Sequence, residues 1–185
     1  MDLFMFSQVA EITRCLYLSS AAAVRGERIR TLGITHVINV TQEIPNLQMP
    51  NLESLQIHIE DTPSARLGLY FDRCADKIDQ VETRGGKTLV HCVAGVSRSA
   101  SICIAYLMKY KRMPLDQAYK HVKKCRSVIQ PNVGFWKQLI EFERRLFGRT
   151  TVKMVQSSGG LVPDVYFQEA KSTVWLPSSS SRYGY

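Results

Sequence analysis

A short segment of mostly small residues lies between two apolar stretches, and it limits the possible folds more than any other feature of the chain. The stretch before it, 88–90, is typical of a buried strand, and the stretch after it, 100–108, is typical of a buried helix. The segment itself reads His91-Cys92-Val93-Ala94-Gly95-Val96-Ser97-Arg98-Ser99. A buried strand that turns directly into a buried helix predicts an α/β fold with this loop at the end of a strand.

The place of the loop at the start of a helix makes it a candidate anion site. The first N–H groups of a helix have no partner within the helix, and the helix dipole places partial positive charge there. Successive loop amides can also converge around an oxyanion. Arg98 adds a planar guanidinium that can bind two phosphate oxygens. We therefore expect a phosphate-binding loop, in which the helix start and Arg98 favour the thiolate form of Cys92.

The composition is that of one globular domain. The chain has 185 residues, enough for a single well-buried core but too few for two ordinary domains. Hydrophobic residues make up 45% of the chain and charged residues 22%, which excludes a disordered or collagen-like protein. The formal net charge of +8 favours acidic partners such as phosphoproteins, nucleic acid or anionic lipid, without choosing among them.

The cysteines indicate neither a disulfide framework nor a zinc site. They number five, with no C-x-x-C pair, and the four histidines are scattered singly. Cys103 is expected to be a core thiol, whereas Cys15, Cys74 and Cys125 remain open as redox partners of Cys92. Reduced thiols and the lack of an export signal or a membrane-spanning stretch predict a cytoplasmic protein, with the nucleus as a further location.

Strand and helix patterns alternate along the chain. Apolar runs typical of buried strands lie at 15–18, 36–40, 55–59 and 88–90. Helical patterns lie at 21–32, 67–82, 99–110, 114–124 and 133–147. This order predicts an α/β fold with a central, mostly parallel sheet flanked by helices. Ligands in such sheets bind beyond the carboxyl ends of the strands, which is where Cys92 is expected to lie.

The residues of the loop suit phosphoryl transfer, which needs a nucleophile and positive charge around the transferred group. Cys92 can attack phosphorus and form a phosphocysteine. Arg98 and the amides of 93–99 can hold the non-bridging oxygens, so that no metal is required. Ser99 can donate a hydrogen bond to the sulfur and help the thiolate leave in a second step. His91 is expected to shape the loop by hydrogen bonding rather than to act as a base.

The proton donor must come from another part of the chain. The predicted strand 55–59 runs into a loop that contains Glu60, Asp61 and Pro63. A carboxylic acid there could protonate the leaving oxygen and then, as a carboxylate, activate water. From the residues alone, Asp61 is the first candidate, and Glu60 is nearly as good.

Several motifs then resemble one family. His91-Cys92-x5-Arg98-Ser99 resembles the signature of the cysteine-based protein tyrosine phosphatases, and 94–100 resembles that of their dual-specificity branch. Asp61 followed by Thr62 and Pro63 is similar to the general-acid loop of that branch, so the resemblance favours Asp61 over Glu60. Further similarity covers 105–108, 131–136, 151–156 and 162–166, the last two being similar to the C-terminal extension of small atypical members.

The resemblance implies a protein phosphatase that hydrolyses phosphotyrosine together with phosphoserine and phosphothreonine, without a cofactor. Its partners would be phosphorylated proteins, with members of the MAP kinase pathways as the usual suggestion, and neither nucleic acid nor membrane. It also implies a shallow pocket, which lets the short phosphothreonine side chain bring its phosphorus to Cys92. The chain departs from many relatives at Val93, where alanine is common, and we expect only modest tuning of the pocket wall.

The resemblance covers 12–148 and divides the chain into four parts. We expect an N-terminal segment at 1–11, a catalytic domain at 12–148 and a C-terminal extension packed on that domain at 149–175. The remaining residues, 176–185, follow a proline and include four serines. This composition is typical of a disordered tail.

Other functions remain open from the residues. A lipid or RNA phosphatase could use the same loop, although polyanionic substrates favour extra cations, and the variable positions here are Val93, Ala94, Val96 and Ser97. A module that binds phosphoproteins without turnover would commonly have lost a catalytic residue. A sulfur-transfer enzyme of the rhodanese type would share the cysteine but would not need Asp61.

Outside the loop, two further features have alternative interpretations. Arg126 and Asn132 flank 127–131 and could reach the loop, although capping of the following helix by itself explains Asn132. A cluster of basic residues is typical of a solvated face, with a docking surface for acidic partners as the alternative. This cluster comprises Lys109, Lys111, Arg112, Lys120, Lys123 and Lys124.

Overall fold

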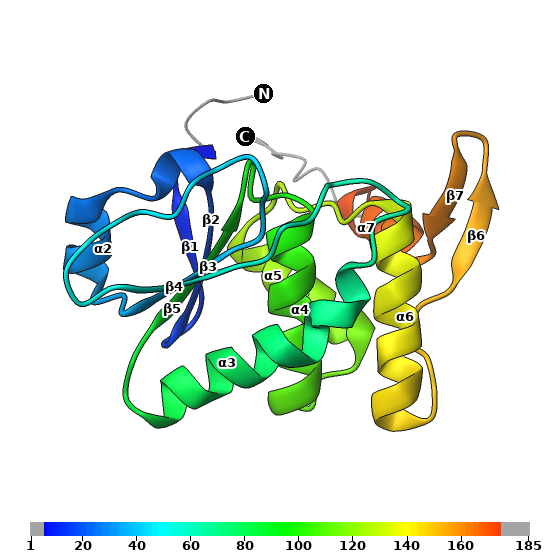
Figure 1. Cartoon of the computed structure of the whole chain (residues 1–185). Helices are drawn as coiled ribbons and strands as arrows, with labels where there is room; N and C mark the ends of the chain where they lie inside the picture. The colour runs from blue at the N-terminus through cyan, green and yellow to red at the C-terminus, as the bar shows by residue number, and fades with distance from the viewer. Residues whose placement is uncertain (1–5, 175–185) are drawn as a thin grey trace, which may run out of the picture.

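A five-stranded sheet with the order β1-β2-β5-β3-β4 lies at the centre of the molecule (Figure 1). Its strands are β1 (Val9–Thr13), β2 (Leu16–Ser20), β3 (His36–Asn39), β4 (Glu53–Gln56) and β5 (Thr88–Cys92). The strand β1 is antiparallel to β2, and the other pairs are parallel. The structure, a computed structural model, describes residues 6–174. Its sheet confirms the predicted central, mostly parallel α/β architecture.

Helices cover both faces of the sheet (Figure 1). One face is covered by α2 (Gly26–Leu32). Two short 3-10 helices connect elements of the fold: η1 (Ala21–Ala23) precedes α2, and η2 (Leu67–Tyr70) precedes α3. The other face carries α3 (Phe71–Thr83), α4 (Arg98–Tyr110), α5 (Leu115–Cys125) and α6 (Val133–Phe147). The chain continues into a hairpin of β6 (Met154–Ser157) and β7 (Gly160–Pro163) and then into α7 (Val165–Val174).

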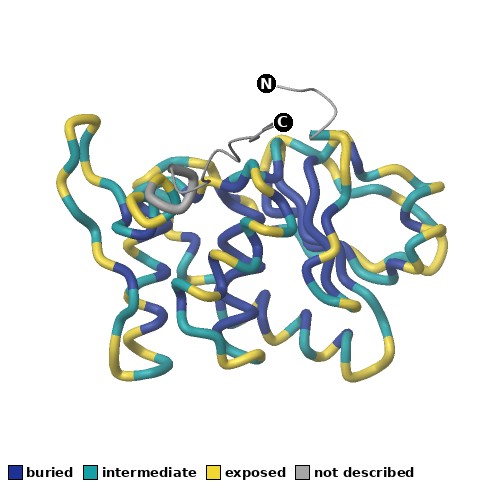
Figure 2. The backbone as a smooth tube through the Cα atoms, turned by 180° about the vertical axis from the view of Figure 1, so that it is seen from behind, coloured by how far each residue is buried: buried dark blue, intermediate teal, exposed yellow. Residues whose placement is uncertain are grey.

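Side-chain alternation along the strands divides the core into two parts. Leu18 and Val90 face the large core beneath α3 to α6, whereas Tyr17 and Leu89 face the smaller core beneath α2. Every residue of α4 from 98 to 108 is buried, and Figure 2 shows this helix as a dark segment inside the molecule. A helix that is apolar on all sides must be enclosed on all sides. The candidate phosphate-binding loop is therefore followed directly by a deeply buried helix.

The N-terminal part of the fold differs from the sequence-based expectation. The predicted boundary between residues 11 and 12 falls inside β1, because Ala10 and Ile12 face the core while Glu11 is exposed. Such alternation is typical of an edge strand with one buried face, and a search for continuous apolar runs misses it. The predicted helix 21–32 is also interrupted, since η1 ends at Ala23 and α2 begins only at Gly26.

Other differences lie at the edge of the sheet and at the C-terminus. The predicted strand 55–59 is wrong in its bounds, because β4 begins at Glu53 and ends at Gln56. Ile57 and Ile59 are buried after the chain has left β4. The hairpin β6–β7 and α7 were not expected from the pattern after residue 148. The predicted disorder of 176–185 lies outside the described residues. Between residues 6 and 174, none of the helices has the length and apolar character needed to span a bilayer.

Candidate active site

The segment 92–98 connects the end of β5 to the start of α4, at the carboxyl edge of the parallel strands. Cys92 is the last residue of β5, pairs in register with Ser20 of β2, and is only 2% exposed. Its Sγ lies 3.1 Å from Oγ of Ser99 and accepts a hydrogen bond from the amide of Gly95 at 3.2 Å. These polar neighbours can stabilise negative charge on the sulfur.

Arg126 holds the outer side of this loop. Its Nε donates to the carbonyl of Gly95 at 2.8 Å, and its Nη2 donates to the carbonyl of Ala94 at 3.1 Å. Its Nη1 donates to the carbonyl of Gln8 at 3.1 Å, which ties the loop to the chain just before β1. Burial lowers the pKa of Arg126, but a guanidinium keeps its charge at any physiological pH. The sequence analysis left open whether Arg126 reaches the loop, and the structure shows that it does.

The remaining loop carbonyls are also engaged. The carbonyl of Val93 accepts from the amide of Ala21 at 3.0 Å, and that of Val96 accepts from the amide of Gln130 at 2.8 Å. The carbonyl of Ser97 accepts from Oγ of Ser101 at 2.8 Å. In a trans peptide the C=O and N–H groups point in opposite directions, so outward carbonyls leave the amides facing the centre of the loop. The loop is therefore shaped as an anion site.

Gly95 is required for the tight packing of the loop against β2. Its φ of +70° lies in the left-handed region, and an added Cβ would lie 2.5 Å from the carbonyl carbon and oxygen of Ser19. Because both atoms belong to backbone, they cannot move aside as a side chain would. A larger residue would push the loop away from the sheet.

Arg98 is the first residue of α4 and is buried at 3% exposure. Its Nη1 donates to both carboxylate oxygens of Glu43, at 3.1 and 2.9 Å, and to the carbonyl of Ile59 at 2.9 Å. Its buried Nε has no protein partner within the described part of the chain and remains available for an oxyanion. The hydrogen bond from Arg98 lowers the pKa of Glu43 and so keeps this carboxylate ionised.

Sequence reasoning missed Glu43. It lies in the loop between β3 and β4, where Thr-Gln-Glu-Ile-Pro shows neither a periodic pattern nor a motif. Only the packing of the sheet brings this loop to an arginine that is 55 positions away. No local signal could have identified the pair.

His91 lies beneath the loop rather than within reach of solvent. It is 2% exposed, and its Nδ1 lies 3.1 Å from the carbonyl of Cys92, to which it can donate. Burial lowers the pKa of His91, so the neutral ring is favoured. The chemical roles of His91 and of the other loop residues stay predictions, although the geometry brings them together as expected from the sequence.

Asp61 reaches the loop through Asn132. The side-chain Nδ2 of Asn132 donates to Oδ1 of Asp61 at 2.9 Å, while its backbone amide donates to Oγ of Ser97 at 3.0 Å. Its Oδ1 also accepts from the amide of Phe135 at 2.9 Å and thereby caps α6. Helix capping accounts for only part of the role of Asn132. By contrast, Oε1 of the alternative candidate Glu60 accepts from Gln42 Nε2 at 3.2 Å.

The loop that carries Asp61 rests directly on the first turn of α6. An added Cβ on Gly134 would lie 1.9 Å from the carbonyl oxygen of Pro63, so only glycine permits this contact. Pro63 therefore lies against the backbone of α6 and helps fix the exposed Asp61 in place. The contact explains why glycine follows Asn132 by two positions.

Cys74 and Cys103 lack the polar surroundings of Cys92. All five cysteines are free, and Cys74 and Cys103 are completely buried. Burial raises the pKa of Cys74 to about 12 and raises that of Cys103 as well. Such thiols are poor nucleophiles. Among residues 6–174, no group of three or more histidine, cysteine or acidic side chains could hold a metal ion.

The basic cluster is largely paired with nearby acceptors. Lys109 lies 2.7 Å from Asp72 and 2.6 Å from Asp76, and Lys111 lies 3.0 Å from Glu82. Paired lysines of this kind support the interpretation as an ordinary solvated face.

Comparison with known proteins agrees with this geometry. Residues 16–145 match the family model "Dual specificity phosphatase, catalytic domain". Dual specificity protein phosphatase 14 of Homo sapiens is 51% identical over 164 residues, covering 88% of this chain and 83% of the relative. Dual specificity protein phosphatase 18 of Bos taurus is 46% identical over 171 residues, covering 92% and 91%.

The fold is shared with solved structures as well. A mouse dual specificity phosphatase, crystallised as a complex with zinc tungstate, has a TM-score of 0.73 and 34% identity, covering 76% of this chain and 89% of the other. The family match and the similarity over most of the chain place this protein among the dual-specificity protein phosphatases, as an atypical member that resembles dual specificity protein phosphatase 14.

Proposed function

We propose that this dual-specificity protein phosphatase works through a phosphocysteine on Cys92, with Arg98, Ser99 and Asp61 as its other catalytic residues. The observation that supports this most strongly is the placement of Sγ of Cys92 between Ser99 Oγ and the Gly95 amide, at the start of α4. A thiolate needs such polar partners, because Cys92 is otherwise buried.

In the first step, Sγ of Cys92 attacks phosphorus in line with the leaving oxygen, and the P–O bond breaks as the S–P bond forms. Asp61 gives its proton to the departing phenolic or alcoholic oxygen. Arg98 and the inward amides hold the three non-bridging oxygens as negative charge redistributes. Nε of Arg98, which has no partner among the described residues, can add a bond to the phosphoryl oxygens.

In the second step, Asp61 is a carboxylate and accepts a proton from an attacking water molecule. The new P–O bond forms, the S–P bond breaks, and inorganic phosphate leaves. Ser99 Oγ then donates to the departing sulfur, which makes the thiolate a better leaving group. Asn132 acts as a positioning residue, because its Nδ2 holds Oδ1 of Asp61.

The substrates are phosphorylated proteins, as for the family, and within that class we assign proteins of the MAP kinase pathways as the partners. Support for both phosphotyrosine and phosphothreonine as targets comes from the exposed side chain of Val93, 42% accessible, which indicates an open rim. The uncharged loop positions 93–97 give no extra cations for polyanionic lipids or RNA. A cytoplasmic, and also nuclear, location fits these substrates. The mouse relative crystallised as a complex with zinc tungstate supports oxyanion binding by proteins of this fold.

The proposal is tested with Cys92→Ser, which should abolish turnover of phosphotyrosine and phosphothreonine peptides while retaining their binding. Mass spectrometry of acid-quenched wild type should detect a phosphoryl group on Cys92. The matched control is Cys15→Ser, a half-buried cysteine in the turn between β1 and β2, which should keep wild-type activity. Undiminished hydrolysis by Cys92→Ser would exclude the covalent mechanism.

The role of Asp61 is tested by the choice of leaving group. Asp61→Asn should slow phosphothreonine hydrolysis more than that of an activated aryl phosphate, because an alkoxide needs the proton more than a phenolate does. Equal losses on the two substrates would contradict the assignment. A parallel assay on a phosphoinositide and on 5′-triphosphate RNA should give much slower turnover than on phosphopeptides.

A further inference from the structure

A groove of about 350 Å³ lies beside the candidate active site. One wall consists of 130–133 together with Trp136 of α6, and the other consists of 161–163 and Tyr166 from the C-terminal extension. In Figure 1 the hairpin β6–β7 lies on the side of α6 that faces away from the central sheet. The extension therefore forms part of a concave surface beside the candidate active site.

The first wall is continuous with the phosphate loop. The amide of Gln130 donates to the carbonyl of Val96 at 2.8 Å, and the amide of Asn132 donates to Oγ of Ser97 at 3.0 Å. The side chain of Asn132 also binds Asp61 at 2.9 Å. The same short segment thus forms the rim of the catalytic pocket and the wall of the groove, so a substrate chain that leaves the pocket can pass directly into the groove.

The second wall is fixed by buried contacts. Oη of Tyr166 accepts from Nε1 of Trp136 at 2.9 Å, and the ring of Tyr166 lies 6.0 Å from that of Tyr119. Val165 is fully buried beside it. Before the hairpin, Thr151 is bound by the buried carboxylate of Glu143. A wall held in this way is ordered before a ligand arrives, which lowers the entropy cost of binding.

The lining of the groove carries no charged side chain among the described residues. Apolar surface comes from residues such as Pro131, Val133 and Leu161, and Leu161 is 37% exposed although it is a large aliphatic residue. By contrast, the larger groove between β4 and α3 is lined by Glu53 and Asp76, among other charged groups. An exposed apolar surface beside a reactive centre marks a place for an apolar partner group.

We propose that this groove is a substrate subsite that binds an uncharged aliphatic or aromatic side chain of the phosphoprotein, next to its phosphorylated residue. The inference rests on the proposed function, since the occupant is the polypeptide whose phosphoryl group is transferred to Cys92. The extension then selects substrates by sequence, and Leu161 is a specificity-determining residue. Asn132 is shared with the catalytic pocket, whereas the wall formed by Leu161 makes no contribution to the chemical step.

The test uses the full chain and phosphothreonine peptides in which one flanking position at a time carries leucine, serine or glutamate. For wild type, leucine at one or two positions should raise kcat/KM about fivefold over serine, since part of one aliphatic side chain leaves water. Leu161→Thr, which keeps β-strand propensity, should remove most of this preference. It should leave turnover of a small aryl phosphate unchanged.

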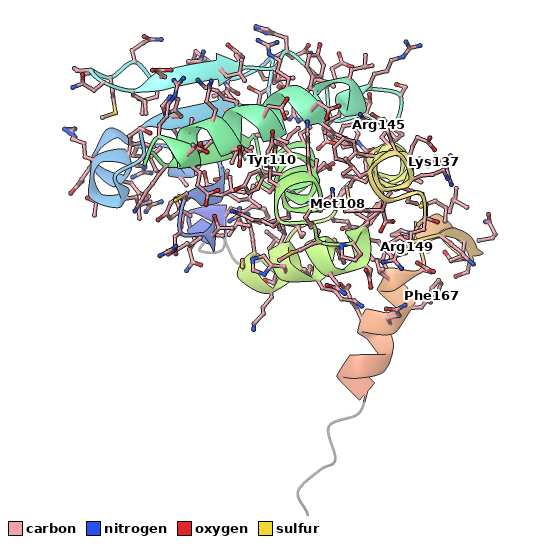
Figure 3. All side chains as sticks on the ribbon, turned by 90° about the horizontal axis from the view of Figure 1, so that it is seen from below. Met108, Tyr110, Lys137, Arg145, Arg149 and Phe167 are labelled. Atoms are coloured by element: carbon pink, nitrogen blue, oxygen red, sulfur yellow. The ribbon has the colours of Figure 1, made fainter. Side chains whose placement is uncertain are left out.

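The matched control is Phe167→Gln. Phe167 is labelled on α7 in Figure 3, is 46% exposed, and does not line the groove. This variant should keep the wild-type preference for leucine. A second variant, Leu161→Lys, should shift the preference from leucine towards glutamate at the same flanking position, which is a gain that simple damage to the fold cannot produce.

The outcomes separate the subsite from the chemistry. A wild-type enzyme that hydrolyses all peptides of the series equally would overturn the subsite and leave the mechanism intact. The subsite is also excluded if Leu161→Lys keeps the leucine preference, or if Phe167→Gln loses it as strongly as Leu161→Thr. Failure of the proposed function would look different, because the aryl phosphate would then be hydrolysed equally by wild type and Cys92→Ser.

Discussion

Arg98 and Glu43 form an ion pair at the base of the phosphate loop, with Nη1 of the arginine 2.9 Å from Oε2 of the glutamate. The arginine is nearly inaccessible, at 4% of its side chain, whereas the glutamate side chain is 46% exposed. The same Nη1 donates to the carbonyl of Ile59. One edge of the guanidinium is therefore fixed by protein groups, whereas its buried Nε has no partner among the described residues.

Loss of the ion pair between Arg98 and Glu43 should weaken the binding of phosphate by Arg98. Glu43→Ala leaves Ile59 as the remaining anchor, so we expect kcat/KM to fall about threefold to tenfold. The Ki of inorganic phosphate should rise by a similar factor. Glu60→Ala, which removes an exposed carboxylate from the neighbouring loop, is the control and should change neither value. Tighter phosphate binding by Glu43→Ala would mean that the carboxylate competes with the ligand instead of orienting the arginine.

The contact between Gly134 and Pro63 should control proton transfer. In Gly134→Ala the new Cβ would overlap the carbonyl of Pro63, so the loop of Asp61 must move away from α6. We expect phosphothreonine turnover to fall about tenfold to a hundredfold, with a smaller loss on an activated aryl phosphate.

The control for Gly134 is Gly159→Ala in the β6–β7 hairpin, where a Cβ would meet no atom closer than 4.0 Å. This variant should behave as wild type on both substrates. Equal losses on both substrates in Gly134→Ala would instead indicate general damage to the site.

The buried carboxylate of Glu143 should be important for stability. Its Oε1 accepts from the amide of Leu115 at 2.9 Å and from Oγ1 of Thr151 at 2.7 Å, and its Oε2 accepts from the amide of Thr151 at 2.8 Å. Glu143→Gln replaces one acceptor by a donor, which should lower the free energy of unfolding by about 1–3 kcal/mol. Urea unfolding measures the change. Glu141→Gln, on the exposed side of α6, should alter stability by less than about 0.5 kcal/mol.

Buried His91 should make the fold sensitive to mild acid. The unfolded chain has an ordinary histidine pKa near 6.5, and burial lowers the pKa of His91 in the folded protein. As the pH falls below 6.5, the unfolded chain takes up the proton first and is stabilised, so the Tm should decrease. His91→Gln has no ring to titrate and should show a weaker decrease of Tm between pH 7 and 5.5. An identical pH dependence in both proteins would exclude His91 as the source.

The sequence was most informative where the structure depends on residues that are close together in the chain. The loop from Cys92 to Ser99 lies between adjacent elements, so the strand, the turn and the helix could all be expected from neighbouring residues. Asp61 could be separated from Glu60 only by resemblance, because the distinction depends on the distant Asn132. Glu43 had no signal at all, since an ion pair between remote loops depends on the packing of the whole sheet.

The elements that the sequence analysis missed are those with weak apolar patterns. In β1, one face is exposed and the apolar residues only alternate. The hairpin β6–β7 contacts α6 through β7, and Val152 before the hairpin and Pro163 at its end are buried. Local sequence patterns predict elements that have a continuous apolar face. The strand β1 and the hairpin β6–β7 have weaker patterns and are held in place by packing against α5 and α6, respectively.

The engagement of every carbonyl from Val93 to Ser97 has a practical consequence for inhibitor design. A peptide that has its carbonyl fixed on one side cannot rotate its amide without breaking that bond. The hydrogen-bond donors of the loop therefore keep one arrangement across ligands, and a tetrahedral oxyanion mimic can be built onto a rigid template. Selectivity between related enzymes must then come from groups that extend past Val93 and Asn132, rather than from the mimic itself.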